Sequence, residues 1–92
     1  MKINNLLQNK NNIHKVDVLF DLKGNSYTIP ADNTYYKTLI LVSGICNIKI
    51  ERKNDINELK MEKDTKISIN SDFNIELYKY NSKTKIIIIY NE

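Results

Sequence analysis

The sequence is poor in the residues from which most catalytic sites and covalent cross-links are made. Among its 92 residues are one histidine, one cysteine, one arginine, one proline, two glycines and no tryptophan. A single cysteine excludes a disulfide within the chain, and a single histidine excludes a metal site built from two histidines of the same chain. Two glycines are too few for a phosphate-cradling loop. The sequence therefore predicts a protein that is not an enzyme and that uses no metal or cofactor.

Strong charge and long apolar segments are also lacking. The 14 basic and 11 acidic residues are interspersed and leave a net charge of +3, which gives little support for a nucleic-acid partner. No apolar run approaches the length of a membrane span, and the first twelve residues have no signal-peptide pattern. The 15 Ile, 14 Asn and 13 Lys are typical of AT-rich codons. We expect the protein to come either from a low-GC bacterium, where it would be cytoplasmic, or from a phage of such a bacterium, where it would belong to the virion.

What the chain does have is a period-two pattern of apolar residues, which is typical of half-buried β-strands. Turn-forming Gly, Asn, Asp and Ser residues separate the segments at spacings near ten residues. The expected strands lie within residues 13–20, 26–33, 34–44, 45–51, 56–61, 65–70, 73–80 and 84–90. The pattern predicts an all-β, single-domain antiparallel β-sandwich or jelly roll of about eight short strands at residues 13–92, preceded by a flexible arm at residues 1–12.

Two of these segments, YYKTLILV and KIIIIY, are apolar on both faces. An edge strand of this kind with one face in water would be prone to aggregation. Each strand is therefore either central in its sheet or covered by a second copy of the chain. We expect a homodimer or homotrimer whose contact includes four residues: Tyr35, Leu39, Ile87 and Ile89.

Two residues with reactive side chains have ordinary structural explanations. His14 stands at the start of a strand, three residues before Asp17, so that the two side chains point to opposite faces; we interpret it as a surface histidine. Cys46 alternates with Ile48 and Ile50 and is expected to be an unreactive core residue.

Two further groups are candidates for binding a partner. Tyr78 and Tyr80 are expected on one strand face, where tyrosines beside lysines could stack on nucleic-acid bases but more often pack against protein. Leu6 and Leu7, in the N-terminal arm, could dock on a larger assembly.

The stretch YTIPADNTYYKTLILVSGICNIKIE at residues 27–51 resembles the opening of two groups of small jelly-roll proteins. One group comprises the auxiliary capsid, decoration and fibre proteins of tailed phages, and this resemblance implies a structural role on a capsid. The other comprises the cupin-like domains, for which a metal-binding barrel is implied. Because the histidine and glutamate cluster of that family is absent, the cupin resemblance implies a metal-free domain that binds a small molecule.

The interpretation favoured by the sequence is a non-enzymatic phage virion protein that self-associates and docks on a larger assembly. The first alternative is a metal-free cupin-like domain that binds a small molecule. The second is a small inhibitor or a single-stranded nucleic-acid-binding module from a mobile element. A cavity between the sheets would favour the cupin-like alternative, since isoleucine-rich filling leaves little space for a ligand.

Overall fold

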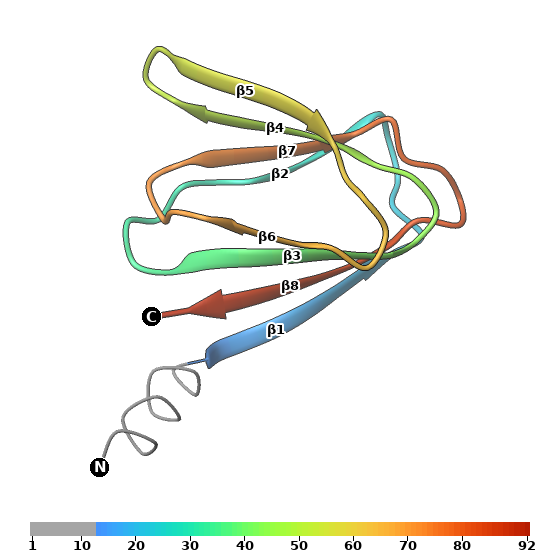
Figure 1. Ribbon diagram of the computed structural model, residues 1–92, viewed down its shortest axis with the longest axis horizontal. Helices are drawn as coiled ribbons and strands as arrows, with labels where there is room; N and C mark the ends of the chain where they lie inside the picture. Colours follow the sequence, from blue (N-terminus) through green and yellow to red (C-terminus); the bar gives the residue numbers. More distant parts are fainter. Residues whose placement is uncertain (1–12) are drawn as a thin grey trace.

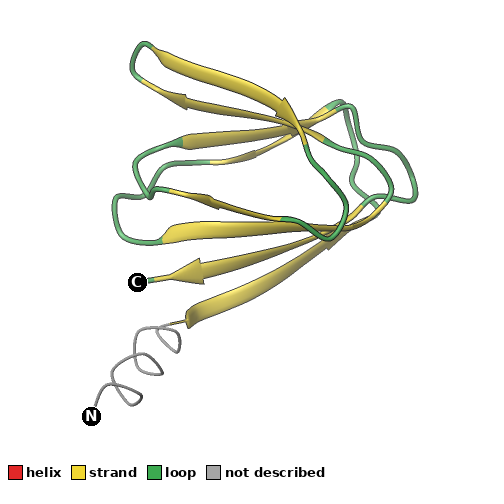
Figure 2. Ribbon diagram, viewed as in Figure 1, coloured by secondary structure: helices red, strands yellow, loops and turns green. Residues whose placement is uncertain are grey.

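The computed structural model describes residues 13–92, and within this range every regular element is a strand (Figure 2). The predicted number of strands and the all-β class are confirmed. The strands are β1 (Ile13–Phe20), β2 (Ser26–Ile29), β3 (Tyr36–Ser43), β4 (Asn47–Arg52), β5 (Asp55–Lys60), β6 (Lys66–Ile69), β7 (Asn74–Tyr78) and β8 (Lys85–Asn91).

The eight strands form one long hairpin rolled into two sheets, which is the jelly-roll arrangement. The hairpin turns between β4 and β5, and its two arms then pair antiparallel as β3 with β6, β2 with β7 and β1 with β8. Rolling separates these pairs into sheet A, of order β1-β8-β3-β6, and sheet B, of order β2-β7-β4-β5. The two layers face each other in Figure 1.

The isoleucine-rich strand β8 is central in sheet A, between β1 and β3. Its alternate residues Ile86 and Ile88 are fully buried between the sheets, as are Leu41 of β3 and Leu77 of β7. Ile87 points to the opposite, outer face and is only half-buried. The expectation of a central strand is therefore confirmed for β8, and also for β3, which lies between β8 and β6.

One glycine is required by a close backbone contact. Gly44 has a φ of +77°, and a Cβ atom at this position would lie 2.5 Å from the Cα of Thr84. The buried hydroxyl of Thr84 donates to the carbonyl of Ile45 at 2.6 Å and accepts from the amide of Asn81 at 3.0 Å. Gly44 thus allows the β3–β4 and β7–β8 connections to pack against each other at this end of the sandwich.

The structure corrects two expectations about single side chains. Leu39 is 0% exposed between the sheets, so it is a core residue and we remove it from the expected contact between copies. Tyr80 does not share a strand face with Tyr78, because β7 ends at Tyr78 and Lys79 reverses the chain with a φ of +55°. Cys46 is fully buried, as expected, and burial raises the pKa of its thiol to about 11.

The other binding candidates have different outcomes. Leu6, Leu7 and the expected arm at residues 1–12 lie outside the described residues. Tyr78 donates to Glu58 at 2.6 Å on the outer face of sheet B, and Tyr80 donates to the carbonyl of Lys23 at 2.9 Å. Residues 13–92 contain no helix with the length and hydropathy to cross a membrane.

Candidate active site

A row of polar side chains crosses the inner face of sheet A. Tyr90 of β8 pairs with Lys15 of β1 on one side and with Lys37 of β3 on the other. Directly paired residues of neighbouring strands project to the same face of a sheet. Tyr90 alternates with the buried Ile88, so all three polar side chains point toward sheet B.

Lys37 is the most unusual member of this row, because its side chain is 0% exposed. Its ammonium group donates to Oδ2 of Asp32 at 2.9 Å and lies 5.9 Å from the centre of the Tyr90 ring. A buried ammonium group is costly unless it is paired, and Asp32 supplies the opposite charge. The β2–β3 loop and the start of β3 therefore hold an ion pair whose lysine is buried and whose aspartate side chain remains 34% exposed.

Asp32 is held by the loop that contains it. Its Oδ1 accepts from the amides of Thr34 at 2.8 Å and Tyr35 at 2.9 Å, while Oδ2 accepts from Lys37. Burial opposes ionisation of Asp32, but the hydrogen bond from Lys37 and those from the two amides outweigh it and lower the pKa of this carboxyl to about 2. Asp32 is therefore a carboxylate at neutral pH, with its lone pairs already engaged.

The other end of the row is open to solvent. The ammonium group of Lys15 lies 4.6 Å from the centre of the Tyr90 ring and 3.8 Å from Oδ2 of Asp17. Asp17 pairs with Ile88 and so faces the same inner space, with 41% of its side chain exposed. Asp17 is thus an accessible carboxylate beside the phenol of Tyr90.

Burial and nearby negative charge act together on Tyr90. Burial is the largest effect that raises the pKa of its phenol, and the charges of Asp17 and Asp32 raise this pKa further. Tyr27, which faces inward from β2 on the opposite sheet, is close enough to add to this effect. The phenol of Tyr90 is consequently a protonated hydrogen-bond donor at neutral pH.

We call these six residues the mouth cluster: Lys15, Asp17, Tyr27, Asp32, Lys37 and Tyr90. The residues of the cluster come from β1, β8 and the start of β3 in sheet A, from the β2–β3 loop, and from β2, an edge strand of sheet B. His14 lies beside it, with its ring stacked on that of Tyr35 at 4.3 Å between centroids. The cluster combines a carboxylate, a phenol and a buried cation, the groups needed to move a proton and to stabilise a developing negative charge.

The sequence analysis did not identify this cluster, although one signal was present. In YYKTLILV, Lys37 stands at the strand position that alternates with Leu39 and Leu41, where only apolar residues are expected. A lysine on the inner face of a central strand requires a buried partner. The partner, Asp32, lies in the preceding turn and could have been interpreted only as a capping residue.

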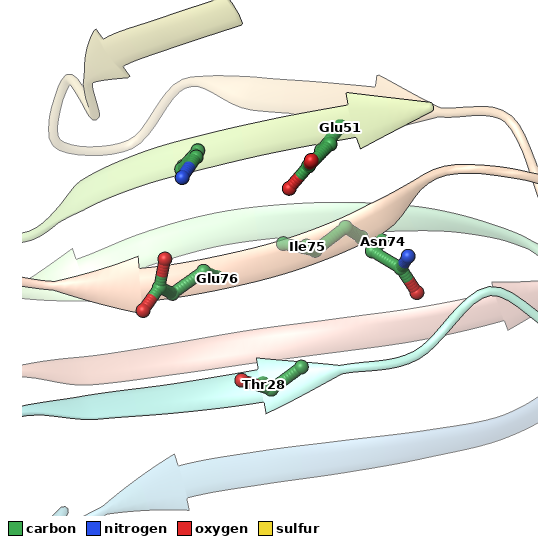
Figure 3. A pocket seen from close by; sticks show the side chains of 6 residues that line it. Thr28, Glu51, Asn74, Ile75 and Glu76 are labelled. Carbon is green, nitrogen blue, oxygen red and sulfur yellow. The ribbon is translucent and has the colours of Figure 1, made fainter. Parts of the chain in front are cut away.

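Hollows lie elsewhere in the described residues, and none of their linings includes a residue of the mouth cluster. A gap of about 380 Å³ opens between the free edges of β5 and β6 and is lined mainly by apolar side chains, among them Ile50, Leu59 and Phe73. A second hollow, of about 370 Å³, lies on the outer face of sheet B (Figure 3). There Glu51 and Glu76 come from the neighbouring strands β4 and β7, with Thr28 on β2. Neither hollow contains a set of groups comparable with the mouth cluster.

The residues present do not fit the metal centre that a cupin-like fold implies. Within residues 13–92 no three His, Cys, Asp or Glu side chains are grouped closely enough to hold a metal ion. At the mouth cluster the central position is taken by the ammonium group of Lys37, whose positive charge would repel a metal cation.

Comparison with solved structures identifies the architecture. A TDP-fucose-3,4-ketoisomerase from Campylobacter jejuni superposes with a TM-score of 0.75 and 16% identity, over 87% of this chain and 61% of that one. A sugar 3,4-ketoisomerase from Thermoanaerobacterium thermosaccharolyticum, solved with TDP-4-keto-6-deoxyglucose, gives a TM-score of 0.74 and 12% identity over 87% and 59% of the chains. This chain has the fold of the sugar 3,4-ketoisomerases.

The same fold recurs in a 3,4-ketoisomerase from Helicobacter canadensis, with a TM-score of 0.74 and 14% identity over 87% of this chain and 62% of that chain. The chain therefore spans about three fifths of the length of these enzymes. No family model and no curated protein matches the sequence.

These findings correct the functional expectation. Solved structures that share this fold include several 3,4-ketoisomerases, among them a TDP-fucose and a TDP-quinovose enzyme, whereas the expectation was a non-enzymatic phage virion protein. The phage resemblance of residues 27–51 was wrong. The virion location rested on that resemblance and is left without support, while the expected capsid partner stays a prediction. A short strand, a Pro-Ala turn and an alternating strand are features of jelly rolls in general, so they did not distinguish the two groups.

Proposed function

We propose that this chain is a metal-free cupin-like domain that binds a nucleotide-linked keto sugar at the mouth cluster and isomerises it by proton transfer. The observation that carries the proposal is the buried ammonium group of Lys37, paired with the partly exposed Asp32 beside the phenol of Tyr90, inside a fold shared with several sugar 3,4-ketoisomerases. A buried charge in a small core costs stability, so the placement of Lys37 beside partly exposed polar partners favours a role in binding or catalysis.

The proposed reaction needs a base, an acid and a cation. Moving a carbonyl from C4 to C3 of a sugar requires removal of the C3 proton, protonation of the resulting O4 oxyanion to give an enediol, loss of the O3 hydroxyl proton, and return of a proton to C4. Asp17 is the exposed carboxylate that takes the proton, and the phenol of Tyr90 donates to the developing oxyanion. Lys37, fixed by Asp32, supplies positive charge to this oxyanion.

The test uses the full chain and TDP-4-keto-6-deoxyglucose in D₂O, followed by proton NMR. Turnover is expected to give the 3-keto isomer with deuterium on the sugar ring. In the variant Tyr90→Phe only the hydroxyl is removed, and we expect the rate to fall roughly 10²-fold while the fold is kept. The matched control is Tyr78→Phe, which removes a phenol on the outer face of sheet B and is expected to leave the rate unchanged.

Binding is measured separately, by calorimetric titration with TDP. One outcome is that TDP binds but the sugar nucleotide is not isomerised, and that Lys37→Met weakens binding while the exposed Lys66→Met does not. This outcome would support the narrower function of a small-molecule-binding domain and would exclude catalysis by this chain alone. If TDP does not bind and TDP-4-keto-6-deoxyglucose is not turned over, the proposed substrate class is wrong.

A further inference from the structure

The outer face of sheet A is an apolar surface without a covering layer in the described residues. Val16 and Val18 of β1 pair with Ile89 and Ile87 of β8, and Ile87 pairs in turn with Ile40 of β3. Paired residues project to the same side, and these alternate with the buried residues of the core. The sheet therefore carries apolar side chains on both of its faces.

We call this surface the outer apolar face. It comprises Ile13, Val16, Val18, Phe20, Tyr36, Ile40, Ile87 and Ile89. Five of its side chains are more than a third exposed, from 39% for Tyr36 to 65% for Phe20. The strands that carry them, β1, β8 and β3, are neighbours in one sheet, so the surface is continuous (Figure 1).

We propose that this surface is the contact of a two-fold symmetric dimer, with a second copy of this chain packed face to face on it. The exposed apolar area of these side chains is on the order of 500–700 Å² per copy. Doubling this gives roughly 1,000–1,400 Å² in a dimer, the range from which specific interfaces begin. A monomer seldom leaves a single apolar patch of this size in water.

The distribution of charge favours a copy of the same chain over a charged partner. The charged side chains on this side of the sheet, Lys66 of β6 and Lys85 at the start of β8, stand at its margin. Uncharged centres with polar margins are typical of protein interfaces. The outer apolar face therefore offers no charge pattern by which an acidic or basic partner would be selected.

The opposite outer face explains why the assembly closes at two copies. On sheet B the outward positions are mostly polar or charged and include Lys49, Glu51, Glu58 and Glu76, while Ile56 of the edge strand β5 is an exposed apolar exception. When a chain buries one apolar face against the same face of another copy, the isologous contact leaves no second surface for growth. A dimer is thus favoured over the trimer that the sequence also allowed.

Val18 and Ile56 form a matched pair for testing the contact. Each is 50% exposed, and each lies on an edge strand, β1 in sheet A and β5 in sheet B. Val18 is in the outer apolar face, whereas Ile56 pairs with Glu51 on the opposite side of the molecule. The substitutions Val18→Lys and Ile56→Lys place the same charge at comparable exposure and differ only in the face that they alter.

The experiment is sedimentation velocity on the full chain from about 1 to about 100 µM, with circular dichroism to verify folding. We expect wild type and Ile56→Lys to dimerise alike, and Val18→Lys to be a folded monomer with a dimer Kd raised at least 100-fold, because two-fold symmetry buries two new lysines. A wild-type monomer throughout this range would overturn the proposal, as would an unchanged dimer of Val18→Lys. A monomer that dimerises only after removal of residues 1–12 would instead assign the surface to that segment of the chain.

Discussion

Among single residues, the pair of Asp32 and Lys37 combines stability with function. Lys37 is buried without solvent contact, and Asp32 has its carboxylate engaged by two amides and the ammonium group. Removing the charge of Asp32 leaves the buried ammonium group of Lys37 unpaired, whereas removing Lys37 leaves a carboxylate whose side chain is 34% exposed and can be hydrated. The site therefore cannot lose the charge of Asp32 without a cost to the whole fold.

Acid titration tests this pair. The pKa of Asp32 lies at about 2 in the folded protein, below its ordinary 3.8, so its contribution is present above pH 4 and is lost as the pH falls toward 2. Because Asp32 is partly exposed, we expect the contribution to be only about 1–2 kcal/mol. Urea unfolding of wild type should show this loss, whereas Asp32→Asn should be less stable at pH 7 and vary less between pH 4 and 2. Equal slopes for the two proteins in this range would contradict the assignment.

Among the connections between strands, the contact of Gly44 with Thr84 fixes how two turns meet. The φ of +77° and the 2.5 Å approach to the Thr84 backbone both require a residue without a Cβ atom. Neighbouring hydrogen bonds from Thr84 join the two turns across 39 residues of sequence. This contact holds β8 in place at the end where it begins.

The substitution Gly44→Ala is expected to destabilise the fold. Left-handed backbone costs about 1–3 kcal/mol for a residue with a side chain, and displacement of the Thr84 backbone adds to this. At Gly24, with a φ of +74°, a Cβ atom meets nothing within 4 Å, so Gly24→Ala is the control that carries the backbone cost alone. Thermal unfolding should place Gly44→Ala clearly below Gly24→Ala; similar melting temperatures would show that the close approach relaxes without cost.

For the whole molecule, the two outer surfaces have opposite character. Sheet A presents valine, isoleucine and phenylalanine side chains outward, while sheet B presents lysine and glutamate. A chain of this length buries only about 60–65% of the surface exposed by its unfolded form. Burial of one sheet face against a second copy would enlarge a small core without adding residues.

Dimerisation makes stability depend on concentration. If two copies share the outer apolar face, the melting temperature of wild type should rise by a few degrees between about 1 and 100 µM, because unfolding requires dissociation. The folded monomer expected for Val18→Lys should melt at one temperature across this range. A melting temperature independent of concentration in wild type would contradict the dimer, while leaving the mouth cluster and its proposed chemistry untouched.

The sequence by itself determined the class of fold and the character of its strands. Alternation placed Cys46, Ile48 and Ile75 inward correctly, since side chains of a strand must point to opposite faces in turn. The four consecutive isoleucines required a strand that is either central or covered by a second copy, and β8 is central. These are local properties, fixed by strand geometry and by the cost of exposing apolar surface.

Only the tertiary structure decided where the polar groups meet. Lys15, Lys37 and Tyr90 are separated by up to 75 positions, and only the register of β1, β8 and β3 brings them into one row. Tyr80 does not lie on the strand face expected for it, because the positive φ of Lys79 reverses the chain directly after β7 ends. Pairing between distant strands carries no local signature in sequence, so the candidate site, unlike the strands that form it, could be found only in the folded molecule.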